Sequence, residues 1–393
     1  MNTTTKIPQF GILEGWPGCD FPDTVPVQGF YGNVYIYIWY IFPILHVVFG
    51  TFGNVMTSIV IFRNFRKMTS TSVMLLALAC SDTMFLYMTP FRNWLLYIFK
   101  VDFRGFSDFG CKILILLVYS TYQASSWFLV MLTFERVFCI VRPHKVKLYF
   151  TTKKAIIAVC VIVVLITGHN THVFYGFGNH PVSEFLGREG CQISQENYIT
   201  FYRYYWHWIH FATSYIVPCT AIVFGNTFIV YKLRNSAMDS KRAETASASN
   251  TRKNDTNGTT SKLRPTRLSK QKKSVTLMLI MLSLIFIISQ TPLTIFLICE
   301  SHLLYDANKY ACTDFPEYLD KAGKFKFTEA IVHNLGYLNS SINFFLYVLS
   351  GSRFRKDVKA LLMCRRLSRA HVVFSETRNS SLRNSDLRHS TSL

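Results

Sequence analysis

The residues best placed to do chemistry in this sequence are an acid and a base side by side, Glu135 and Arg136. They end an apolar run that starts at Cys111 and has no charge between Lys112 and Glu135. The chemistry that these two side chains allow is ion pairing, because a charge in hydrocarbon is costly unless it is paired and faces protein or water. A membrane helix whose end charges snorkel to the interface is the simpler interpretation. Cys111 at one end and Pro143, seven residues after Arg136, favour a functional pair.

The element that must position this pair is a membrane-spanning helix, since a span needs about 20 apolar residues. Half of all residues are hydrophobic and only 16% are charged, whereas soluble domains carry about 25%. The net charge is +20, but the basic residues separate apolar runs and form no single patch. The composition therefore indicates a bilayer protein with membrane-lipid contacts, and no nucleic-acid partner.

Seven apolar segments reach or approach the spanning length, and the seventh is the least apolar. They run over 34–62, 70–98, 109–141, 153–175, 201–232, 273–300 and 327–349. The loops after the first, third and fifth segments, and the tail, are rich in Lys and Arg, while the other loops are mixed in sign. The positive-inside bias predicts an extracellular N-terminus, a cytoplasmic C-terminus and a multi-pass place in the plasma membrane. The fold class is an all-α membrane protein.

Four regions follow from this layout. We expect an extracellular N-terminus at 1–33 and a seven-helix bundle at 34–351, in which the polar stretch 235–269 is a flexible cytoplasmic loop. Residues 352–366 predict an amphipathic membrane-surface helix, with basic residues on one face and four apolar residues on the other: Phe354, Val358, Leu361 and Leu362. The Ser- and Arg-rich tail 367–393 is expected to be disordered.

Several residues are candidates for covalent modification. Asn2 begins a glycosylation sequon on the outer side. Cys364 ends the amphipathic helix and is either palmitoylated or a plain thiol. Four cysteines fall on the outer side, where oxidation can occur: Cys19, Cys111, Cys191 and Cys312. A Cys111–Cys191 bridge would hold the loop before the fifth span over the bundle mouth, which leaves Cys19 and Cys312 as a second pair.

Seven spans with these marks resemble the rhodopsin-like (class A) G-protein-coupled receptors over about 34–366. The matching positions are Gly53-Asn54-Val55, the second-helix acid Asp82, the disulfide pair Cys111 and Cys191, Glu135-Arg136-Val137, Pro143, the fifth- and sixth-helix prolines Pro218 and Pro292, and Asn343 with Tyr347. The resemblance implies that Glu135 holds Arg136 at rest and releases it to a heterotrimeric G protein. It also implies that Pro218 and Pro292 act as hinges, since proline removes a helical hydrogen bond.

Four polar residues lie within apolar helices and need partners there: Asn54, Asp82, Asn339 and Asn343. The resemblance implies a shared network around an allosteric sodium ion and water; simple interhelical hydrogen bonding is the alternative. Some positions depart from the family. Gln290 stands where Trp is usual, Asn226 where Tyr is common and Phe344 where Pro is usual, while Phe286 is retained. These departures lie at positions that the resemblance assigns to receptor activation.

Two ligand classes are disfavoured by single positions. Tyr337 occupies the place of the retinal-binding Lys of opsins, and Val118 the place of the amine-binding Asp. The outer halves instead offer aromatic, polar and acidic side chains suited to a peptide: Trp94, Tyr119, Tyr122, Gln123, Phe296, Glu300 and Glu329. The alternative for each of them is an ordinary residue of the belt at the membrane–water interface, with no ligand contact.

The seventh-helix run, with Asn343-Phe344 after Asn-Ser-Ser, resembles invertebrate neuropeptide receptors of the FMRFamide, myosuppressin and sex-peptide type. This implies an amidated ligand ending in Arg-Phe-amide, whose Arg pairs with Glu329 or Glu300. We therefore expect a neuropeptide receptor that couples to G proteins, arrestin and receptor kinases and has no enzymatic activity. Alternatives are a small-molecule or lipid receptor and, further off, a channel or transporter, for which internal repeats would be expected.

Overall fold

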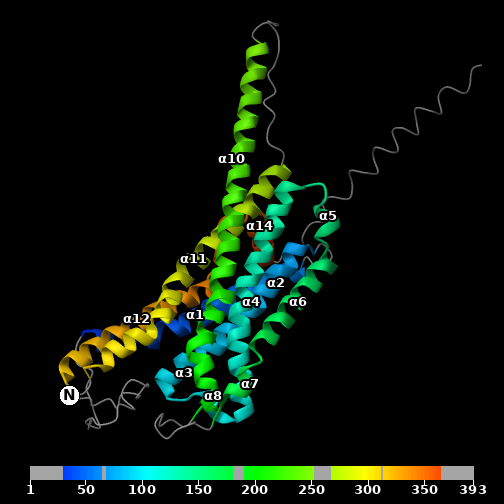
Figure 1. Cartoon of the computed structure of the whole chain (residues 1–393). Coiled ribbons are helices and arrows are strands. Elements are labelled where there is room, and N and C mark those ends of the chain that lie inside the picture. The colour runs from blue at the N-terminus through cyan, green and yellow to red at the C-terminus, as the bar shows by residue number, and fades with distance from the viewer. Residues whose placement is uncertain (1–29, 64–67, 180–189, 252–266, 311–312, 364–393) are drawn as a thin grey trace, which may run out of the picture.

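The structure is a computed structural model, and it describes residues 30–63, 68–179, 190–251, 267–310 and 313–363. Within these ranges the chain is a bundle of seven helical spans followed by a short eighth helix (Figure 1). Several predicted features lie outside the described residues: Asn2, Cys19, Cys312, Cys364, and most of the N-terminal region and the tail. They stay predictions.

Helices cover all seven predicted spans apart from short breaks at 171–172 and Ile342, and the fifth, sixth and seventh helices extend beyond the predicted bounds. The first four spans are α1 (Phe30–Arg63), then α2 (Ser70–Leu86) with η2 (Tyr87–Phe91) and α3 (Arg92–Phe99), then α4 (Asp108–Val141), then α6 (Thr152–Asn170) with α7 (Val173–Gly176). The fifth span consists of α8 (Glu196–Phe201), η5 (Tyr202–Trp206), α9 (His207–Phe211), η6 (Ala212–Ile216) and α10 (Val217–Thr251). The sixth span is α11 (Arg267–Asn308), and the seventh is α12 (Phe315–Ser341) with α13 (Asn343–Ser350). The short eighth helix is α14 (Ser352–Leu362). Shorter elements are η3 (Phe103–Phe106), α5 (Val146–Tyr149), β1 (Phe177–Gly178) and β2 (Gln192–Ile193).

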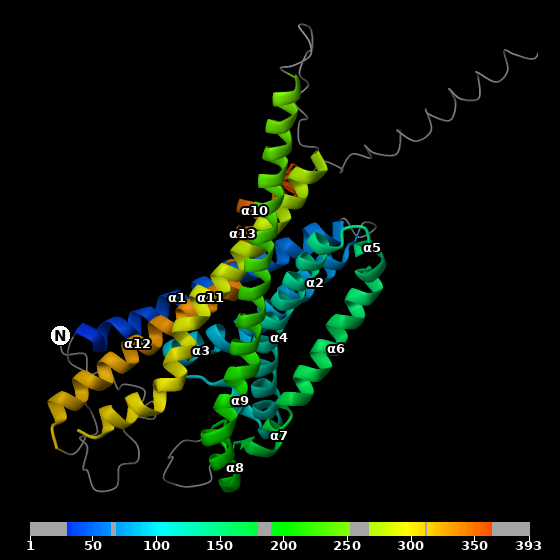
Figure 2. The ribbon, with the colours of Figure 1, turned by 45° about the horizontal axis from the view of Figure 1, so that its top comes forward.

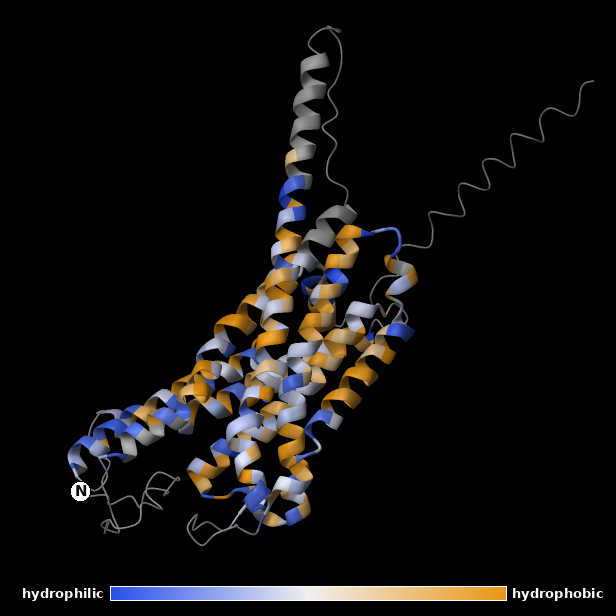
Figure 3. Cartoon of the chain, viewed as in Figure 1, coloured by the Kyte–Doolittle hydropathy of each residue, from blue (hydrophilic) through white to orange (hydrophobic). Residues whose placement is uncertain are grey.

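Six spans of the described chain are long and apolar enough to cross a membrane. Apolar residues cover their outer faces (Figure 3), and α6 exposes Ile157, Val164 and Leu165 where lipid would lie. The seventh span, α12 with α13, falls below that threshold because it carries several polar residues. It is interrupted at Ile342, just before Asn343, although the sequence has Phe344 where the family has proline.

The two ends of the bundle differ, and we name them by their marker residues. The disulfide end holds the Cys111–Cys191 bridge, and the arginine end holds Arg136. Toward the disulfide end, α1, α11 and α12 incline to one side, away from α4, α6 and α10 (Figure 2). α3 lies between these two groups in both views. Both groups bear predicted ligand residues, among them Tyr119 of α4 and Glu329 of α12.

α10 differs from the expectation at the arginine end. The sequence predicts a flexible loop from residue 235, but the helix continues to Thr251 and projects beyond the bundle (Figure 1). Residues 235–251 mix strong helix formers such as Ala, Met, Lys, Arg and Glu with Ser, Thr, Asn and Asp, and they contain no Gly or Pro that would end a helix continuing from the span. Residues 252–266 lie outside the described chain.

α14 has the predicted amphipathic character. Val358 is buried in a cluster with Val60 of α1 and Phe344 of α13, and Phe354 and Leu361 pack against that cluster. Leu362, which was expected on the same face, is instead exposed. Gly53 lets α1 approach α13 closely, since a Cβ there would lie 2.7 Å from the Phe344 Cβ.

Candidate functional site

The disulfide end is held together by the predicted bridge between Cys111 and Cys191, whose Cα atoms are 5.3 Å apart. Cys191 directly precedes β2, which pairs antiparallel with β1 so that Phe177 faces Ile193. The backbone N–H of Asn179 donates to Asp108 at 3.1 Å, which ties the hairpin to the start of α4 a second time. The hairpin was not predicted from the sequence, because strands of two residues have no periodic signal.

Tyr119 and Tyr122 of α4 lie together in an aromatic group at this end. The Tyr119 and Tyr202 hydroxyls are hydrogen bonded at 2.7 Å, and the Tyr119 ring lies 4.9 Å from His210. Tyr122 also contacts His210, at 5.9 Å between ring centroids, and its hydroxyl donates to Gln290 Oε1 at 3.0 Å. These contacts join the third, fifth and sixth spans around two predicted ligand residues.

Three other predicted ligand residues lie elsewhere. Gln123 is buried and accepts a hydrogen bond from Asn170 of α6 at 3.0 Å. It follows Tyr122 directly, and one residue turns a helix by about 100°, so the two side chains point to different neighbours. Phe296 is buried against Phe325, with ring centroids 5.3 Å apart.

Trp94 is the third. Its indole N–H donates to the Tyr40 carbonyl at 3.1 Å, and its ring stacks on Phe91. It therefore faces α1 and its own helix. Apolar and polar patterning alone could not tell these packed positions from the site-facing ones.

The two predicted acids lie on α11 and α12. Glu329 is already paired, since Lys326 Nζ donates to its carboxylate at 2.8 Å, and both side chains are about one-fifth exposed. The charges of Glu329 and Lys326 both act on Glu300. The two acids, which the sequence analysis offered as alternative partners of a ligand Arg, therefore lie within electrostatic reach of each other and of Lys326, which the sequence analysis did not include.

A cluster of opposite sign lies across the disulfide end, at α3 and η3. Arg92 and Arg104 both donate to the Asp102 carboxylate, Arg92 through Nε at 3.0 Å and Arg104 through Nη2 at 2.8 Å. Burial alone would raise the pKa of Asp102, but the hydrogen bonds and charges of the two arginines hold that pKa well below its usual range. Sequence analysis missed this cluster, because nothing in the loop sequence indicates that the three side chains converge.

The polar network at the centre of the bundle has Asp82 as its acceptor. Ser125 and Ser340 donate to Asp82 Oδ1 at 2.7 and 3.0 Å, and Asn343 donates to Oδ2 at 2.7 Å. Asn54 donates to the Ser340 carbonyl at 3.3 Å. The seventh-span contact expected from Asn339 comes instead from Ser340, the next residue; Asn339 is buried beside it. The serines were missed because a lone Ser in a helix is usually satisfied by its own backbone.

Glu135 and Arg136 are paired at the arginine end, with 3.5 Å between Arg136 Nη2 and Glu135 Oε2. Thr71 of α2 donates to both Glu135 oxygens, at 3.0 and 3.1 Å, and also accepts from Arg136. The Arg136 Nε is buried and has no hydrogen-bond partner in the described chain. The predicted ion pair is therefore present, and it is hydrogen bonded to α2 through Thr71, which is not part of the Glu-Arg-Val motif. Pro143 lies exposed just beyond α4.

Gln290 joins three spans. Its Nε2 donates to the Gly336 carbonyl of α12 at 2.9 Å, and its Oε1 accepts from Tyr122 of α4. Below it, Phe286 is buried in the central core, with its ring 6.2 Å from Tyr215. α11 continues as helix through Pro292, and Tyr347 is buried against Phe354 of α14, with ring centroids 5.5 Å apart.

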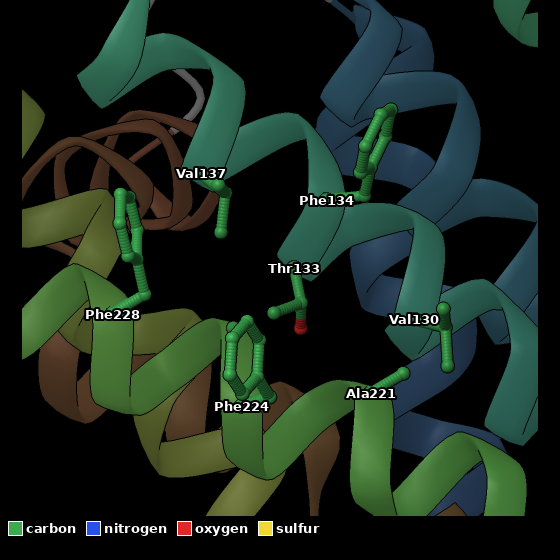
Figure 4. A pocket seen from close by; sticks show the side chains of 8 residues that line it. Val130, Thr133, Phe134, Val137, Ala221, Phe224 and Phe228 are labelled. Atoms are coloured by element: carbon green, nitrogen blue, oxygen red, sulfur yellow. The ribbon is translucent and has the colours of Figure 1, made fainter.

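A cavity of about 370 Å³ opens between α4 and α10, toward the arginine end (Figure 4). Its lining is almost entirely apolar: Val130, Thr133, Phe134, Val137, Ala221, Phe224, Gly225 and Phe228. Phe134 and Phe224 are largely exposed on what would be the lipid side. This cavity lacks the charged and polar groups of the disulfide end and contains none of the predicted ligand residues.

Comparisons with known proteins agree with this architecture. The chain is 23% identical to the allatostatin-A receptor of Bombyx mori over 81% of this chain and 77% of that one. It is 24% identical to the rat hydroxycarboxylic acid receptor 2 over 50% of this chain and 52% of that receptor. It is 34% identical to the guinea-pig type-1 angiotensin II receptor over 37% of this chain and 40% of that receptor. The aligned part thus spans about half of the hydroxycarboxylic acid receptor and less than half of the angiotensin receptor.

The model of the 7 transmembrane receptor (rhodopsin family) matches residues 53–347, well over half of the 393 residues. That stretch contains the Asp82 network, the Glu135–Arg136 pair, the disulfide and the two charged clusters. The chain belongs to the rhodopsin family of seven-transmembrane receptors.

Proposed function

We propose that this chain is a plasma-membrane receptor for an amidated, Arg-Phe-amide-like neuropeptide and that it activates heterotrimeric G proteins. The disulfide end faces outside and the arginine end faces the cytoplasm, as the charge bias of the loops indicates. The observation that carries this proposal is the pair of acids Glu300 and Glu329, because the charge of Glu329 acts on Glu300 and that of Glu300 acts on Tyr119 of α4. A carboxylate binds the ligand guanidinium by paired hydrogen bonds, and the aromatic rings supply contact area for a Phe side chain.

Two relatives support a peptide ligand by name, the allatostatin-A receptor and the type-1 angiotensin II receptor. The resemblance of the seventh span to receptors of the FMRFamide, myosuppressin and sex-peptide type supports an amidated terminus. In this mechanism the ligand Arg displaces Lys326 from Glu329, since both cations compete for one carboxylate. The ligand can shift the receptor only by binding one state better than the other.

The Gln290 bridge offers a route from the ligand to the sixth span. A peptide that contacts Tyr122 would change its hydrogen bond to Gln290 and so the link between α4, α11 and α12. At the arginine end, release of Arg136 from Glu135 and Thr71 would free it for the G protein. The Ser-rich tail supports phosphorylation by receptor kinases and arrestin binding.

The Asp82 cluster is a candidate sodium site. Its carboxylate and the Ser125 and Ser340 hydroxyls are hard oxygen donors, the kind that bind cations of this class. They fit such an ion chemically, and the ion would supply a positive charge to the buried carboxylate. Asn343 already donates to the second carboxylate oxygen and orients it.

The second candidate is a small-molecule or lipid receptor. The relative named as a hydroxycarboxylic acid receptor favours it, with about half of each chain aligned. The two candidates differ in the receptor charges on which ligand binding depends. An acidic small molecule would bind the arginine cluster and would not depend on Glu329, whereas the Arg-Phe-amide peptide would.

The decisive experiment expresses the full chain with a promiscuous G protein and measures calcium release on exposure to a panel of amidated neuropeptides. We expect a response at nanomolar peptide that is lost in Arg136→Ala, with surface expression unchanged. Glu329→Gln should reduce potency at least tenfold, while Glu317→Gln, an acid on the exposed start of α12, should not. Silence across the panel with confirmed surface expression would overturn the peptide assignment.

A further inference from the structure

The arginine cluster at the disulfide end carries an excess of positive charge. Arg92, Arg104 and Asp102 sum to one net positive charge, and the arginine side chains are only 15% and 23% exposed. The bonds described for Arg104 use Nε and Nη2 on Asp102, which leaves Nη1 for another acceptor. A mostly buried net charge is costly unless something neutralises it.

Arg92 is connected to the bundle interior by a chain of hydrogen bonds. Its Nη1 donates to Asn93 Oδ1 at 3.0 Å, and Asn93 Nδ2 donates to the Tyr337 hydroxyl of α12 at 2.8 Å. This chain holds the Arg92 guanidinium at a fixed place against the seventh span. Arg92 uses Nε and Nη2 on Asp102 and Nη1 on Asn93, so two of its five N–H donors, one on each terminal nitrogen, remain for a further carboxylate.

The arginine cluster and the acid pair flank the same tyrosines. The charges of Arg104 and Glu300 both act on Tyr119. Those of Arg92 and Glu329 both act on Tyr337. Glu329 stands eight residues before Tyr337 on α12, which is roughly 12 Å along a helix. Charges of both signs therefore lie near Tyr119 and near Tyr337, and a span of this length is one that a few peptide residues can bridge.

We infer that Arg92 and Arg104 form an anion subsite that binds a carboxylate of the ligand, while Glu300 and Glu329 bind its cationic group. The ligand class is then a short peptide that carries both a basic and an acidic group. This refinement rests in part on the proposed function. The carboxylate has two sources, an acidic side chain or a free C-terminus, and an amidated ligand has only the first.

The test measures binding without signalling, as the shift in the unfolding midpoint of the purified full-length receptor at increasing probe concentration. The peptide probes are Glu-Phe-Met-Arg-Phe-amide, Gln-Phe-Met-Arg-Phe-amide and Gln-Phe-Met-Arg-Phe with a free C-terminus. The non-peptide probes are 4-phenylbutyrate and its amide. We expect one of the two acidic peptides to bind at least tenfold more tightly than the neutral peptide, and which one does so identifies the carboxylate source.

Arg92→Gln and Arg104→Gln should each abolish that preference, and each leaves the other arginine paired with Asp102. Lys112→Gln is the matched control, because it removes a positive charge at the same end that is paired with Asp108 instead. Arg104→Lys keeps the charge and guards against misfolding; it should retain part of the preference.

The outcomes separate the two proposals. Equal binding of acidic and neutral peptides overturns the anion subsite and leaves the peptide site standing. Arginine-dependent binding of 4-phenylbutyrate without any peptide binding supports the subsite and overturns the peptide function. Failure of every probe to shift the midpoint at millimolar concentration overturns both, as would occur if the receptor's own acids already fill the subsite.

Discussion

At the scale of single residues, the most informative departure from the family is Gln290. A tryptophan there would fill space, whereas glutamine makes two directed hydrogen bonds, to Tyr122 and to the Gly336 carbonyl. One of these partners, Tyr122, belongs to the aromatic group at the disulfide end. Gln290 therefore connects the sixth span to the third and seventh spans through two hydrogen bonds.

We predict that Gln290→Ala destabilises the receptor by about 1–3 kcal/mol, because it leaves the Gly336 carbonyl and the Tyr122 hydroxyl without this partner in a buried site. Basal signalling should rise, since the sixth span loses its link to α12. Thermal unfolding and ligand-free calcium release measure the two effects. Tyr122→Phe removes only one of the two bonds and should give a smaller change in both; an unaltered basal level in Gln290→Ala would exclude the bridge as a restraint.

Asp102 permits a prediction about pH, because it lies outside the membrane spans and its pKa is lowered in the folded state. A lowered pKa contributes stability that is fully present above the unfolded value of about 3.9 and is lost as the pH falls toward the folded value. Asp102→Asn should therefore lower the unfolding midpoint by a constant amount between pH 5 and 8. The gap between wild type and variant should narrow below about pH 4. A gap that varied between pH 6 and 8 would assign the effect to another group.

At the scale of elements, close helix contacts depend on small residues. Gly53 is the clearest case, because a Cβ there would lie 2.7 Å from the Phe344 Cβ. The Phe344 ring also packs on Phe52 and Phe354, at 5.9 Å from each, so it has little room to move.

Gly53→Ala should destabilise the receptor by about 1–3 kcal/mol by forcing α1 and α13 apart. Gly168→Ala is the matched control, since it lies within α6 and its added Cβ meets nothing within 4 Å. That variant should be neutral or more stable by up to about 1 kcal/mol, because alanine favours helix. Thermal unfolding of the two purified variants tests the contrast, and equal midpoints would mean that α13 shifts to accommodate the methyl group.

The spans could be predicted from the sequence because a bilayer demands long apolar segments with their backbone bonds satisfied internally. The disulfide and the Glu135–Arg136 pair could be predicted because each has a family position. Side-chain direction could not, as Gln123 shows by facing Asn170 while its neighbour Tyr122 faces Gln290. Contacts made through loops, such as Asp102 with its two arginines, depend on tertiary arrangement that no local pattern encodes.

At the scale of the whole molecule, the disulfide end and the arginine end are joined by the Asp82 network. Asp82 on α2 contacts Ser125 on α4, Ser340 on α12 and Asn343 on α13. Ser81 adds a hydrogen bond to Ser125 at 3.0 Å, so the second and third spans are linked twice. The cluster thus links three spans directly, including the one that bears Arg136.

Sodium should therefore oppose agonist binding if it occupies this cluster in the inactive state. Binding linkage is reciprocal, so replacing sodium chloride with choline chloride at constant ionic strength should raise agonist affinity in the wild type by about fivefold or more. Asp82→Asn removes the only carboxylate of the cluster and should abolish that dependence while preserving the hydrogen-bond acceptor for Ser125. Radioligand or fluorescent-peptide binding in membranes gives the affinities. An equal sodium effect in wild type and Asp82→Asn would place the ion elsewhere and leave the cluster with interhelical hydrogen bonding as its role.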